Sequence, residues 1–411
     1  MVMAKPQTHD IELIPDGGVT SPKGFTAGAV HVGVRTDWTK LDVGMIYSEA
    51  PCKAAATYTS NTLKAAPLLV CREHLKNGHA QAVVANAGCA NAATGQQGYD
   101  NAVAMAKLAA ARLGIDPADV VVASTGVIGT QLPMGRIGDG IEKITLTPEG
   151  GLDFANAIMT TDTVKKHLAL KAGGWTIGAA CKGVGMIHPN MATMLCFITT
   201  DAPVQHDFLG VALKEAVDVS FNMVDIDNDT STNDMAVVLA SGLAGGERVT
   251  AEHPDAALFQ KALTLVCTSM ARKMVRDAEG GTKLIETKVE GAATAIDARK
   301  AAREIVSSVG VKTAMYGEDP NWGRILAAIG NSGANWSPET TRLFLSHPAG
   351  DEICLYADGA PQDYDVAVAK ACLAPDEIFV RVVLGNAEGA ATAWGSDLTE
   401  DFVRLNSMYT T

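Results

Sequence analysis

The sequence predicts an α/β protein in which helices pack on mixed sheets. Short apolar runs with strand character alternate along the chain with longer segments whose apolar residues have helical spacing. The 411 residues are enough to bury a large core and to form two or three domains. Hydrophobic residues make up 47% of the chain and 40 residues are glycine, a composition typical of α/β and α+β proteins.

The composition also narrows the classes of partner. The formal net charge is −13 and no run is rich in lysine or arginine, which argues against nucleic acid as a partner. The eight cysteines form no CxxC pair and no cysteine–histidine cluster, so we expect free thiols in a reducing compartment and no metal site. Residues 1–15 lack the apolar core of a signal peptide, and no segment approaches the roughly 20 apolar residues of a membrane span. We therefore predict a cytoplasmic protein.

The first half of the chain combines strand candidates with one strong helix. An alanine-rich helix is expected over residues 101–113, because Gly114 behind it is a typical helix stop. The strand at 119–123 should end in a turn at Thr125 and Gly126, which could present backbone N–H groups and a hydroxyl to an anion, although a plain tight turn explains the same residues. The expected strands lie at 33–35, 43–47, 54–58, 81–86, 119–123 and 175–178.

The second half has the clearer helical signal. Residues 255–278 carry an apolar stripe at helical spacing, which we expect to face the core and which consists of Phe259, Leu263, Val266, Met270 and Met274. Residues 225–234 are dense in aspartate and asparagine but lack the glycine and glutamate of an EF-hand, so calcium binding is a minority interpretation. Further helices are expected at 208–217, 298–306 and 364–372, and strands at 194–198, 235–239, 284–289, 352–356 and 378–384.

A loop at residues 182–193 connects the halves and runs into the buried strand that starts at Met194. On residue type alone, Thr193 is most simply a β-branched strand residue. A tight turn can also press its hydroxyl against the preceding carbonyl carbon, so that the peptide bond shifts from nitrogen to oxygen as an ester. Water then opens the ester and releases a new chain that begins with threonine. The free α-amine of that chain, with a pKa near ~8, can take the proton of the hydroxyl.

Several motifs make the chain resemble one known family over nearly its whole length. The pattern K-G-x-G-M-x-x-P-x-x-A-T-M-L matches from Lys182 through Leu195, and S-T-G-V-I-G matches residues 124–129. The patterns G-G-V-T-x-P-x-G-F, D-x-E-G-x-T-K, G-x-D-P-N-W-G-R and D-L-T-x-x-Y-V-x-x-N-x-x-Y-x-T follow at 17–25, 277–283, 317–324 and 397–411. The chain thus resembles the ornithine acetyltransferases, the glutamate N-acetyltransferases of arginine biosynthesis. It departs from the family pattern at Ala87, Cys89, Ala93 and Phe402.

The resemblance implies a layered, self-processing fold of the N-terminal-nucleophile type. Cleavage between Ala192 and Thr193 would give fragments 1–192 and 193–411, with Thr193 as the nucleophile. Thr125 and Gly126 match the family's oxyanion hole, whose donors stabilise the tetrahedral intermediate of acyl transfer. The matching substrate-binding positions are Thr161, with Thr160 as a near equal, Lys182, Thr193, Glu279, Asn406 and Thr411.

Other segments receive less specific expectations. Residues 160–163, three threonines around an aspartate, could also form a helix cap. Residues 229–234 match a family segment that is structural or near the site. Residues 316–324 are expected to pack between subunits and to form pocket wall. His188 is tempting as a base, but a freed α-amine makes a histidine unnecessary.

The resemblance also implies an activity. N²-acetylornithine gives its acetyl group to the threonine and leaves as ornithine, and glutamate then takes the acetyl group in a ping-pong cycle. No dissociable cofactor is required, and acetyl-CoA is a second acetyl donor in one branch of the family. Two copies of each fragment are expected to form a heterotetramer. The alternatives are a self-cleaving amidase or aminopeptidase that gives the acyl group to water, and an uncleaved binding protein of the same fold.

Overall fold

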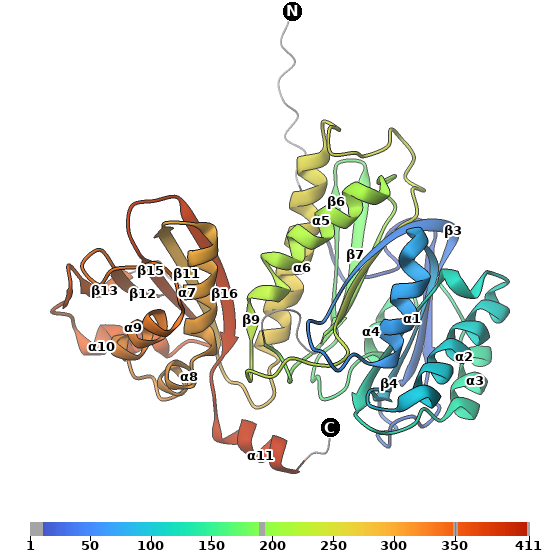
Figure 1. Ribbon diagram of the computed structural model, residues 1–411, viewed down its shortest axis with the longest axis horizontal. Coiled ribbons are helices and arrows are strands. Elements are labelled where there is room, and N and C mark those ends of the chain that lie inside the picture. Colours follow the sequence, from blue (N-terminus) through green and yellow to red (C-terminus); the bar gives the residue numbers. More distant parts are fainter. Residues whose placement is uncertain (1–10, 189–193, 348–349, 351, 409–411) are drawn as a thin grey trace, which may run out of the picture.

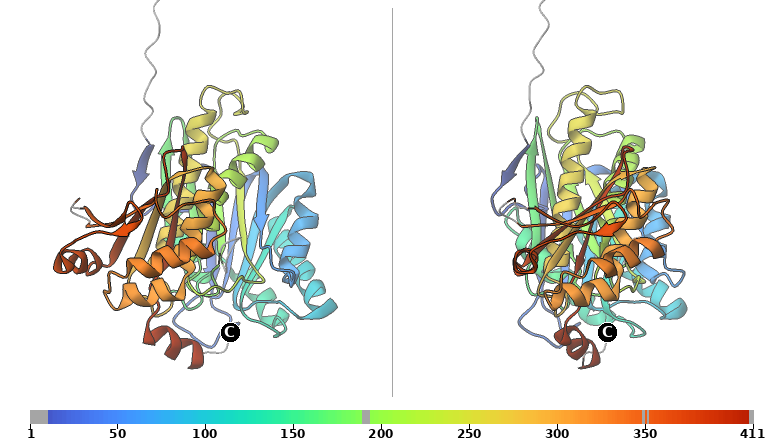
Figure 2. Two further views of the ribbon diagram at one scale, coloured as in Figure 1. Left: turned by 60° about the vertical axis from the view of Figure 1, so that its left-hand side comes forward. Right: turned by 90° about the vertical axis from the view of Figure 1, so that its left-hand side faces the viewer.

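The computed structural model describes residues 11–188, 194–347, 350 and 352–408. Two β-sheets lie side by side, each with its own helices, and helices α5 (His206–Asp218) and α6 (Ala256–Arg276) lie between them (Figure 1). Figure 2 shows the same arrangement from two further sides. This mixture of sheets with packed helices confirms the predicted α/β fold class. Within the described part of the chain, no helix is long and apolar enough to cross a membrane.

The larger sheet is built from the first 240 residues and mixes parallel and antiparallel pairs. Its long strand β3 (Val43–Tyr58) pairs with β2 (Phe25–Val30) and β4 (His79–Cys89) through its first part and with β10 (Met235–Ala240) through its last part. The remaining strands of this sheet are β1 (Ile11–Ile14), β5 (Val120–Val127), β6 (Lys166–Ala172), β7 (Trp175–Lys182) and β8 (Leu195–Thr200). The strand order across the whole sheet is β1-β6-β7-β8-β10-β3-β4-β5, and β2 pairs with β3 outside this path.

Strand β8 is buried on both faces, which is why its first four residues, 195–198, are all apolar. Alternate side chains of a strand point to opposite faces of the sheet. Cys196 and Ile198 join the core shared with α5 and α6, whereas Leu195 and Phe197 join the core of the opposite face. There Phe197 meets the ring of Phe154 edge to face at 5.2 Å. Helices of the opposite core are α1 (Ala66–His74), α2 (Gly95–Leu113), α3 (Met134–Lys143) and α4 (Gly151–Ala157).

The smaller sheet comes from the last third of the chain, apart from one short strand. Its order is β14 (Ala360–Pro361), β13 (Glu352–Ala357), β12 (Arg342–Ser346), β15 (Glu377–Val383), β11 (Leu284–Ala292), β16 (Gly389–Ser396) and β9 (Val224–Asp225). Its helices are α7 (Ala295–Ser307), α8 (Val309–Tyr316), α9 (Trp322–Asn331) and α10 (Val366–Leu373), and α11 (Glu400–Met408) ends the described chain.

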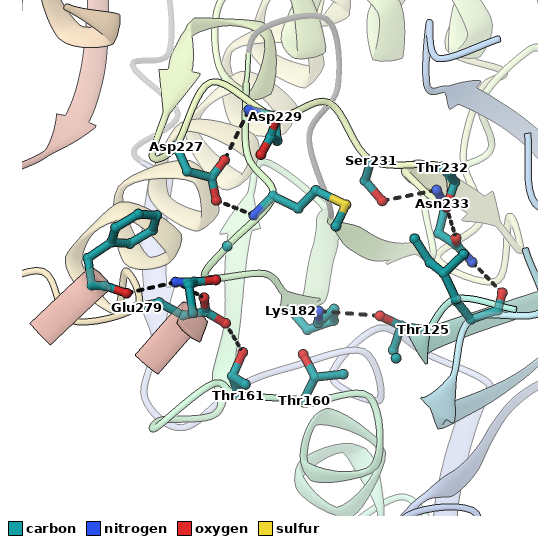
Figure 3. A pocket seen from close by; sticks show the side chains of 17 residues that line it. Thr125, Thr160, Thr161, Lys182, Asp227, Asp229, Ser231, Thr232, Asn233 and Glu279 are labelled. Carbon is teal, nitrogen blue, oxygen red and sulfur yellow. Dashed lines mark hydrogen bonds between the residues drawn. The ribbon is translucent and has the colours of Figure 1, made fainter. Parts of the chain in front are cut away.

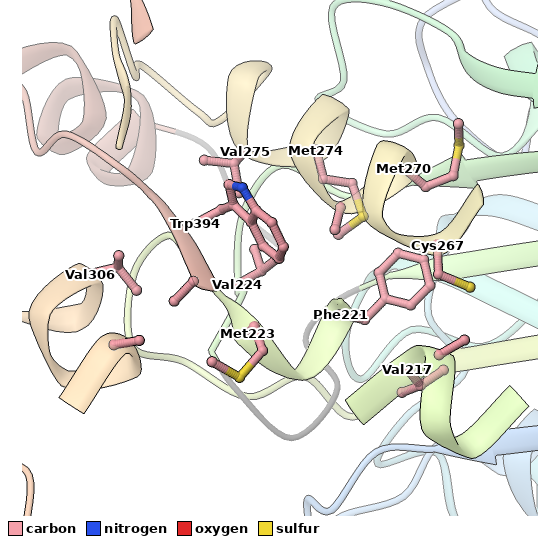
Figure 4. Packing of buried hydrophobic residues seen from close by; sticks show 14 of the residues in the cluster. Val217, Phe221, Met223, Val224, Cys267, Met270, Met274, Val275, Val306 and Trp394 are labelled. Atoms are coloured by element: carbon pink, nitrogen blue, oxygen red, sulfur yellow. The ribbon is translucent and has the colours of Figure 1, made fainter. Parts of the chain in front are cut away.

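Helix α6 joins the two sheets into one core. The stripe predicted from helical spacing is confirmed, since Phe259, Leu263, Val266, Met270 and Met274 are all buried. Figure 4 shows Met274 and Val275 of α6 beside Trp394 of β16, with Met223 and Val224 on the same cluster. The short strand β9 pairs with β16 of the smaller sheet, and its Val224 packs in the core that both sheets share with α6.

Three local expectations are wrong for identifiable reasons. Residues 33–35 form no strand, because the N–H groups of Val32, Val34 and Arg35 donate to the carboxylate of Asp42 instead of to a neighbouring strand. The strands expected at 43–47 and 54–58 are one strand, β3, whose pairing with β4 is irregular between Tyr47 and Cys52. Residues 160–163 cap no helix, because the next element along the chain is the strand β6, which starts at Lys166.

Candidate active site

One cavity of about 270 Å³ collects most of the residues predicted to act on a substrate (Figure 3). Of the predicted residues, Ala192, Thr193 and Thr411 lie outside the described chain. The cavity lies where strands β5 and β7, the turn after α6 and helix α11 meet. Its lining consists of Ala90, Thr125, Gly126, Ile128, Thr160, Thr161, Lys182, Gly185, Met186, Asp227, Asp229, Ser231, Thr232, Asn233, Glu279, Phe402 and Asn406.

Lys182 is the buried cation of the cavity. It is the last residue of β7, it is 2% exposed, and its Nζ lies 3.4 Å from Oγ1 of Thr125. Burial disfavours the ammonium and lowers the pKa of Lys182, although Asp162 and Glu279 pull that pKa in the opposite direction. A desolvated ammonium attracts a carboxylate or a developing oxyanion more strongly than an exposed one, because little water screens it.

Thr125 and Gly126 lie within β5 and not in a turn after it, which corrects the sequence prediction. The pairing of β4 with β5 is irregular here, since Cys89 lies opposite both Thr125 and Val127. Gly126 has a φ of 126°, and a Cβ added to it would lie 2.3 Å from the carbonyl carbon of Gly88. A glycine is therefore required both by the backbone conformation and by the close approach of β4.

A buried network of ion pairs lies next to the lining residues Thr161 and Lys182. The Asp162 carboxylate accepts from Nζ of Lys166 at 2.7 Å and from the backbone N–H of Gly183 at 2.9 Å. Lys166 also pairs with Asp277. Burial opposes ionisation of Asp162, but Lys166 and Lys182 outweigh it and hold the pKa of that carboxyl below its ordinary value. The sequence reasoning did not single out Asp162 or Lys166, although Asp162 stands between the predicted threonines.

Glu279 faces the cavity from the end of α6. It accepts from Thr161 Oγ1 at 2.5 Å and from Asn406 Nδ2 at 3.1 Å, and its own N–H donates to the Val184 carbonyl at 2.8 Å. A Cβ on Gly185 would lie 2.6 Å from Oε2 of Glu279, so the glycine leaves room for the carboxylate. Thr161 and Asn406, predicted to bind substrate, are thereby joined to Glu279 in one cluster.

The C-terminal helix α11 reaches the cavity through two residues, Phe402 and Asn406. Its first turn is held by Thr399, whose Oγ1 donates to the Gly280 carbonyl at 2.6 Å and accepts from Phe402 N–H at 3.0 Å. The described residues of α11 include no buried side chain. A few specific contacts with the turn after α6 therefore determine where Asn406 lies.

An acidic and hydroxyl-rich wall, residues 227–233, closes the other side of the cavity (Figure 3). The Asp227 carboxylate accepts from the N–H groups of Met186, Ile187 and Asp229, which ties this wall to the loop that follows Lys182. Burial, assisted by the nearby Asp225, raises the pKa of Asp227 to about 6. The sequence reasoning placed this segment near the site without naming residues, and its density of polar residues was the available signal.

One expectation about the surroundings of the cavity is corrected. None of residues 316–324 lines the cavity, so they are not pocket wall. Within this segment, Glu318 forms an ion pair with Lys283 at 3.2 Å, and the ring of Trp322 stacks on that of Tyr356. Cys89, one of the departures from the family pattern, does not line the cavity either.

His188 lies away from the cavity lining, with Nδ1 2.8 Å from Asp225. The described cysteines are free thiols, and no group of three or more metal-ligating side chains occurs among the described residues.

The cavity has the properties of an enzyme site for a small molecule that carries both charges. A buried ammonium, a carboxylate held by hydroxyl and amide donors, and a glycine of positive φ next to a hydroxyl side chain converge on one cavity. Such a set matches the carboxylate and amino groups of an amino acid. The chemical role of each residue stays a prediction.

Comparison with known proteins then identifies the family. The ArgJ family profile matches residues 26–411. The arginine biosynthesis bifunctional protein ArgJ of Bacillus subtilis is 47% identical over 96% of this chain and 97% of its own length. The protein of the same name from Symbiobacterium thermophilum is 50% identical over 96% and 99%. The chain belongs to the ArgJ family, and the predicted family and the expectation of an enzyme are thereby confirmed.

Solved structures of the same kind are also similar. The structure of arginine biosynthesis bifunctional protein ArgJ from Bacillus halodurans is 45% identical and covers 51% of this chain and 97% of its own, with a TM-score of 0.49. The structure of ornithine acetyltransferase complexed with ornithine from Mycobacterium tuberculosis is 36% identical and covers 45% and 100%, with a TM-score of 0.43.

Proposed function

We propose that this chain transfers the acetyl group of N²-acetylornithine to glutamate, giving ornithine and N-acetylglutamate in arginine biosynthesis. Membership of the ArgJ family and relatives named arginine biosynthesis bifunctional proteins support the pathway. The observation that carries the substrate class is that Lys182 and Glu279, side chains of opposite charge, line the same cavity. Lys182 binds the carboxylate of an amino acid, and Glu279 binds an amino group.

The proposed nucleophile is Thr193, freed by self-cleavage after Ala192. The α-amine of Thr193 takes the hydroxyl proton, Oγ1 attacks the acetyl carbonyl, and the tetrahedral intermediate collapses with cleavage of the amide C–N bond. The proton passes to the leaving amine, so ornithine departs and an acetyl-threonine ester remains. The amine of glutamate then attacks the ester carbonyl, forms the new amide bond and returns the proton to the threonine hydroxyl.

Thr125 and Gly126 are the proposed oxyanion donors in both half-reactions, and Lys182 adds positive charge beside them. The hydroxyl of Thr125 already lies within reach of Lys182, at 3.4 Å. Preorganised donors of this kind stabilise the oxyanion without reorganising during the reaction. Water must be excluded until glutamate attacks the ester. Phe402 of α11 is an apolar side chain that lines the cavity, and we propose that it helps to exclude water.

We extend the proposal to the other expectations drawn from the family. The word bifunctional in the relatives' names supports acetyl-CoA as a second donor, whose thioester acetylates the same threonine with release of CoA thiol. We also propose a cytoplasmic enzyme with two copies of each fragment. Release of free thiol from acetyl-CoA in the presence of glutamate, without acetylornithine, tests the second donor.

The first experiment is intact-mass analysis of the purified protein with N-terminal sequencing of its fragments, followed by an acetyl-transfer assay. We expect two chains, one beginning Thr-Met-Leu-Cys, and ornithine release that depends on glutamate. Thr193→Ala should stay one chain and be inactive. Ornithine release without glutamate would instead indicate the amidase alternative. A single uncut chain that persists for days would refute the mechanism.

A further inference from the structure

Asn233 connects the polar wall of the cavity to the strand that carries Thr125. Its side chain is 5% exposed, and Nδ2 donates to the carbonyl oxygens of Ala90 at 2.6 Å and Ser124 at 2.8 Å. The Ser124 carbonyl belongs to the peptide group that joins Ser124 to Thr125. One donor of this buried amide therefore holds the backbone directly before Thr125 and Gly126, and the other holds Ala90, which follows β4.

Asp234, the next residue, connects the same wall to the chain that follows Thr193. It is fully buried, and Oδ1 accepts from the backbone N–H of Met194 at 3.0 Å. Its main chain is held as well, because its carbonyl accepts from Thr59 N–H at 3.0 Å. The start of β8 is thus positioned by a side chain in addition to its strand ladder.

These two contacts span parts of the sheet that are not neighbours. In the strand order, β10, β3 and β4 come between β8 and β5. A main-chain ladder passes through all three of those strands, and β3 is irregular where it pairs with β4. The adjacent side chains of Asn233 and Asp234 make the connection directly, at the end of the sheet where the cavity lies.

We propose that Asn233 and Asp234 are positioning residues that set the predicted oxyanion donors, Thr125 and Gly126, relative to Met194, the residue between the predicted nucleophile and β8. This inference rests on the proposed function and deepens it. Thr232 orients the Asn233 amide, because its Oγ1 donates to Asn233 Oδ1 at 2.6 Å and so leaves Nδ2 facing the two carbonyl oxygens. The pair links the two fragments after cleavage, since Asn233 and Asp234 belong to the second and Ser124 to the first.

The sharpest test is Asn233→Asp, which keeps the size of the side chain and replaces the donor by an acceptor. Carbonyl oxygens of Ala90 and Ser124 then face a carboxylate oxygen, so the backbone before Thr125 must shift. A displacement near 1 Å at a reacting centre costs about 10²-fold in rate. We expect kcat for acetyl transfer to fall by about that factor with KM unchanged, because the substrate-binding side chains Lys182 and Glu279 are not displaced.

Asn101→Asp is the matched control. Asn101 is 7% exposed, lies on α2 outside the cavity lining, and donates through Nδ2 to Oε1 of the exposed Gln131 side chain at 3.1 Å. We expect kcat and KM of this variant to equal those of the wild type. An equal loss in both variants would overturn the inference, as would a wild-type kcat or a raised KM with unchanged kcat in Asn233→Asp.

Two further variants keep the test decisive if Asn233→Asp folds poorly in thermal unfolding. Thr232→Val removes only the hydroxyl that orients the amide, and we expect a smaller fall in kcat. Asp234→Ala leaves Met194 N–H without its acceptor and should slow the appearance of the two chains in a mass time course, whereas Asp234→Asn, which keeps an acceptor oxygen, should restore it. Wild-type cleavage by Asp234→Ala would overturn the inference.

The failure of this inference is distinct from failure of the proposed function. If the wild-type protein neither cleaves itself nor transfers acetyl groups, the proposed function fails before any variant is compared. If the wild type does both and the variants match it, only the positioning role fails.

Discussion

Gly280→Ala should release helix α11 from the cavity. Gly280 follows α6 with a φ of +66°, and a Cβ on it would lie 2.4 Å from the backbone nitrogen of Phe402 and 2.7 Å from the carbonyl carbon of Asp401. These neighbours are main-chain atoms, so no side-chain rotation relieves the clash. Either the turn at Gly280 or the start of α11 must move, and α11 has the fewer buried contacts.

The expected loss in the free energy of unfolding of Gly280→Ala has two separable contributions. A left-handed backbone costs a non-glycine residue about 1–2 kcal/mol, and overpacking against rigid atoms adds about 1–3 kcal/mol. The overpacking cost cannot exceed the free energy with which the contacts of Thr399 and Asn406 hold α11, because above that value α11 detaches and the clash is relieved. A hydrogen bond to a charged group such as Glu279 contributes about 1.5–3 kcal/mol. If substrate binding uses Asn406, kcat/KM should then fall about tenfold or more, since 1.4 kcal/mol corresponds to a factor of ten.

Gly114→Ala is the control for backbone strain alone. Gly114 has a φ of +69° at the end of α2, and a Cβ there meets nothing within 4 Å. Denaturant unfolding should show a loss of about 1–2 kcal/mol for Gly114→Ala and a larger loss for Gly280→Ala. Limited proteolysis should remove the tail faster in Gly280→Ala only, and kcat/KM should fall in that variant only. A Gly280→Ala protein with a protected tail and wild-type kcat/KM would refute this account of how α11 is held.

Two further predictions concern buried charges. Lys182→Met removes the ammonium while Asp162 keeps Lys166, so we expect little change in the free energy of unfolding but a fall of at least about tenfold in kcat/KM; unchanged kinetics would exclude a substrate role for Lys182. Asp227 should make stability depend on pH, because its pKa is raised from 3.8 to about 6. The penalty for ionising it is absent below the ordinary pKa, grows as the pH rises through the window between the two values, and is complete above the raised one. In the single-chain Thr193→Ala background, the free energy of unfolding should therefore fall, relative to Asp227→Asn, by up to roughly 3 kcal/mol across this window, and a pH-independent difference between the two proteins would contradict the burial argument.

Much of the fold could be predicted where a segment's own residues decide its structure. The stripe from Phe259 to Met274 determined α6, and Gly114 determined the end of α2, where it adopts a left-handed conformation. Prediction failed where a distant or competing group takes the backbone hydrogen bonds. Asp42 does so for Val32, Val34 and Arg35, and the pairing of β5 with β4 keeps Thr125 and Gly126 in a strand.

The candidate site shows the same division. The resemblance of short motifs to those of the ornithine acetyltransferases selected Thr125, Thr161, Lys182, Glu279 and Asn406, and the structure brings these residues to one cavity. Motifs contain no information about which distant segments meet them.

The sequence by itself determined the family, the residue types of the site and long helices such as α6. Only the tertiary structure decided that Asp162 pairs with Lys166 and through it reaches Asp277, and that Asn233 holds the peptide before Thr125. The second of these contacts joins residues 109 positions apart. Their formation depends on how the core around α6 and the two sheets closes, and no local pattern of residues specifies that geometry.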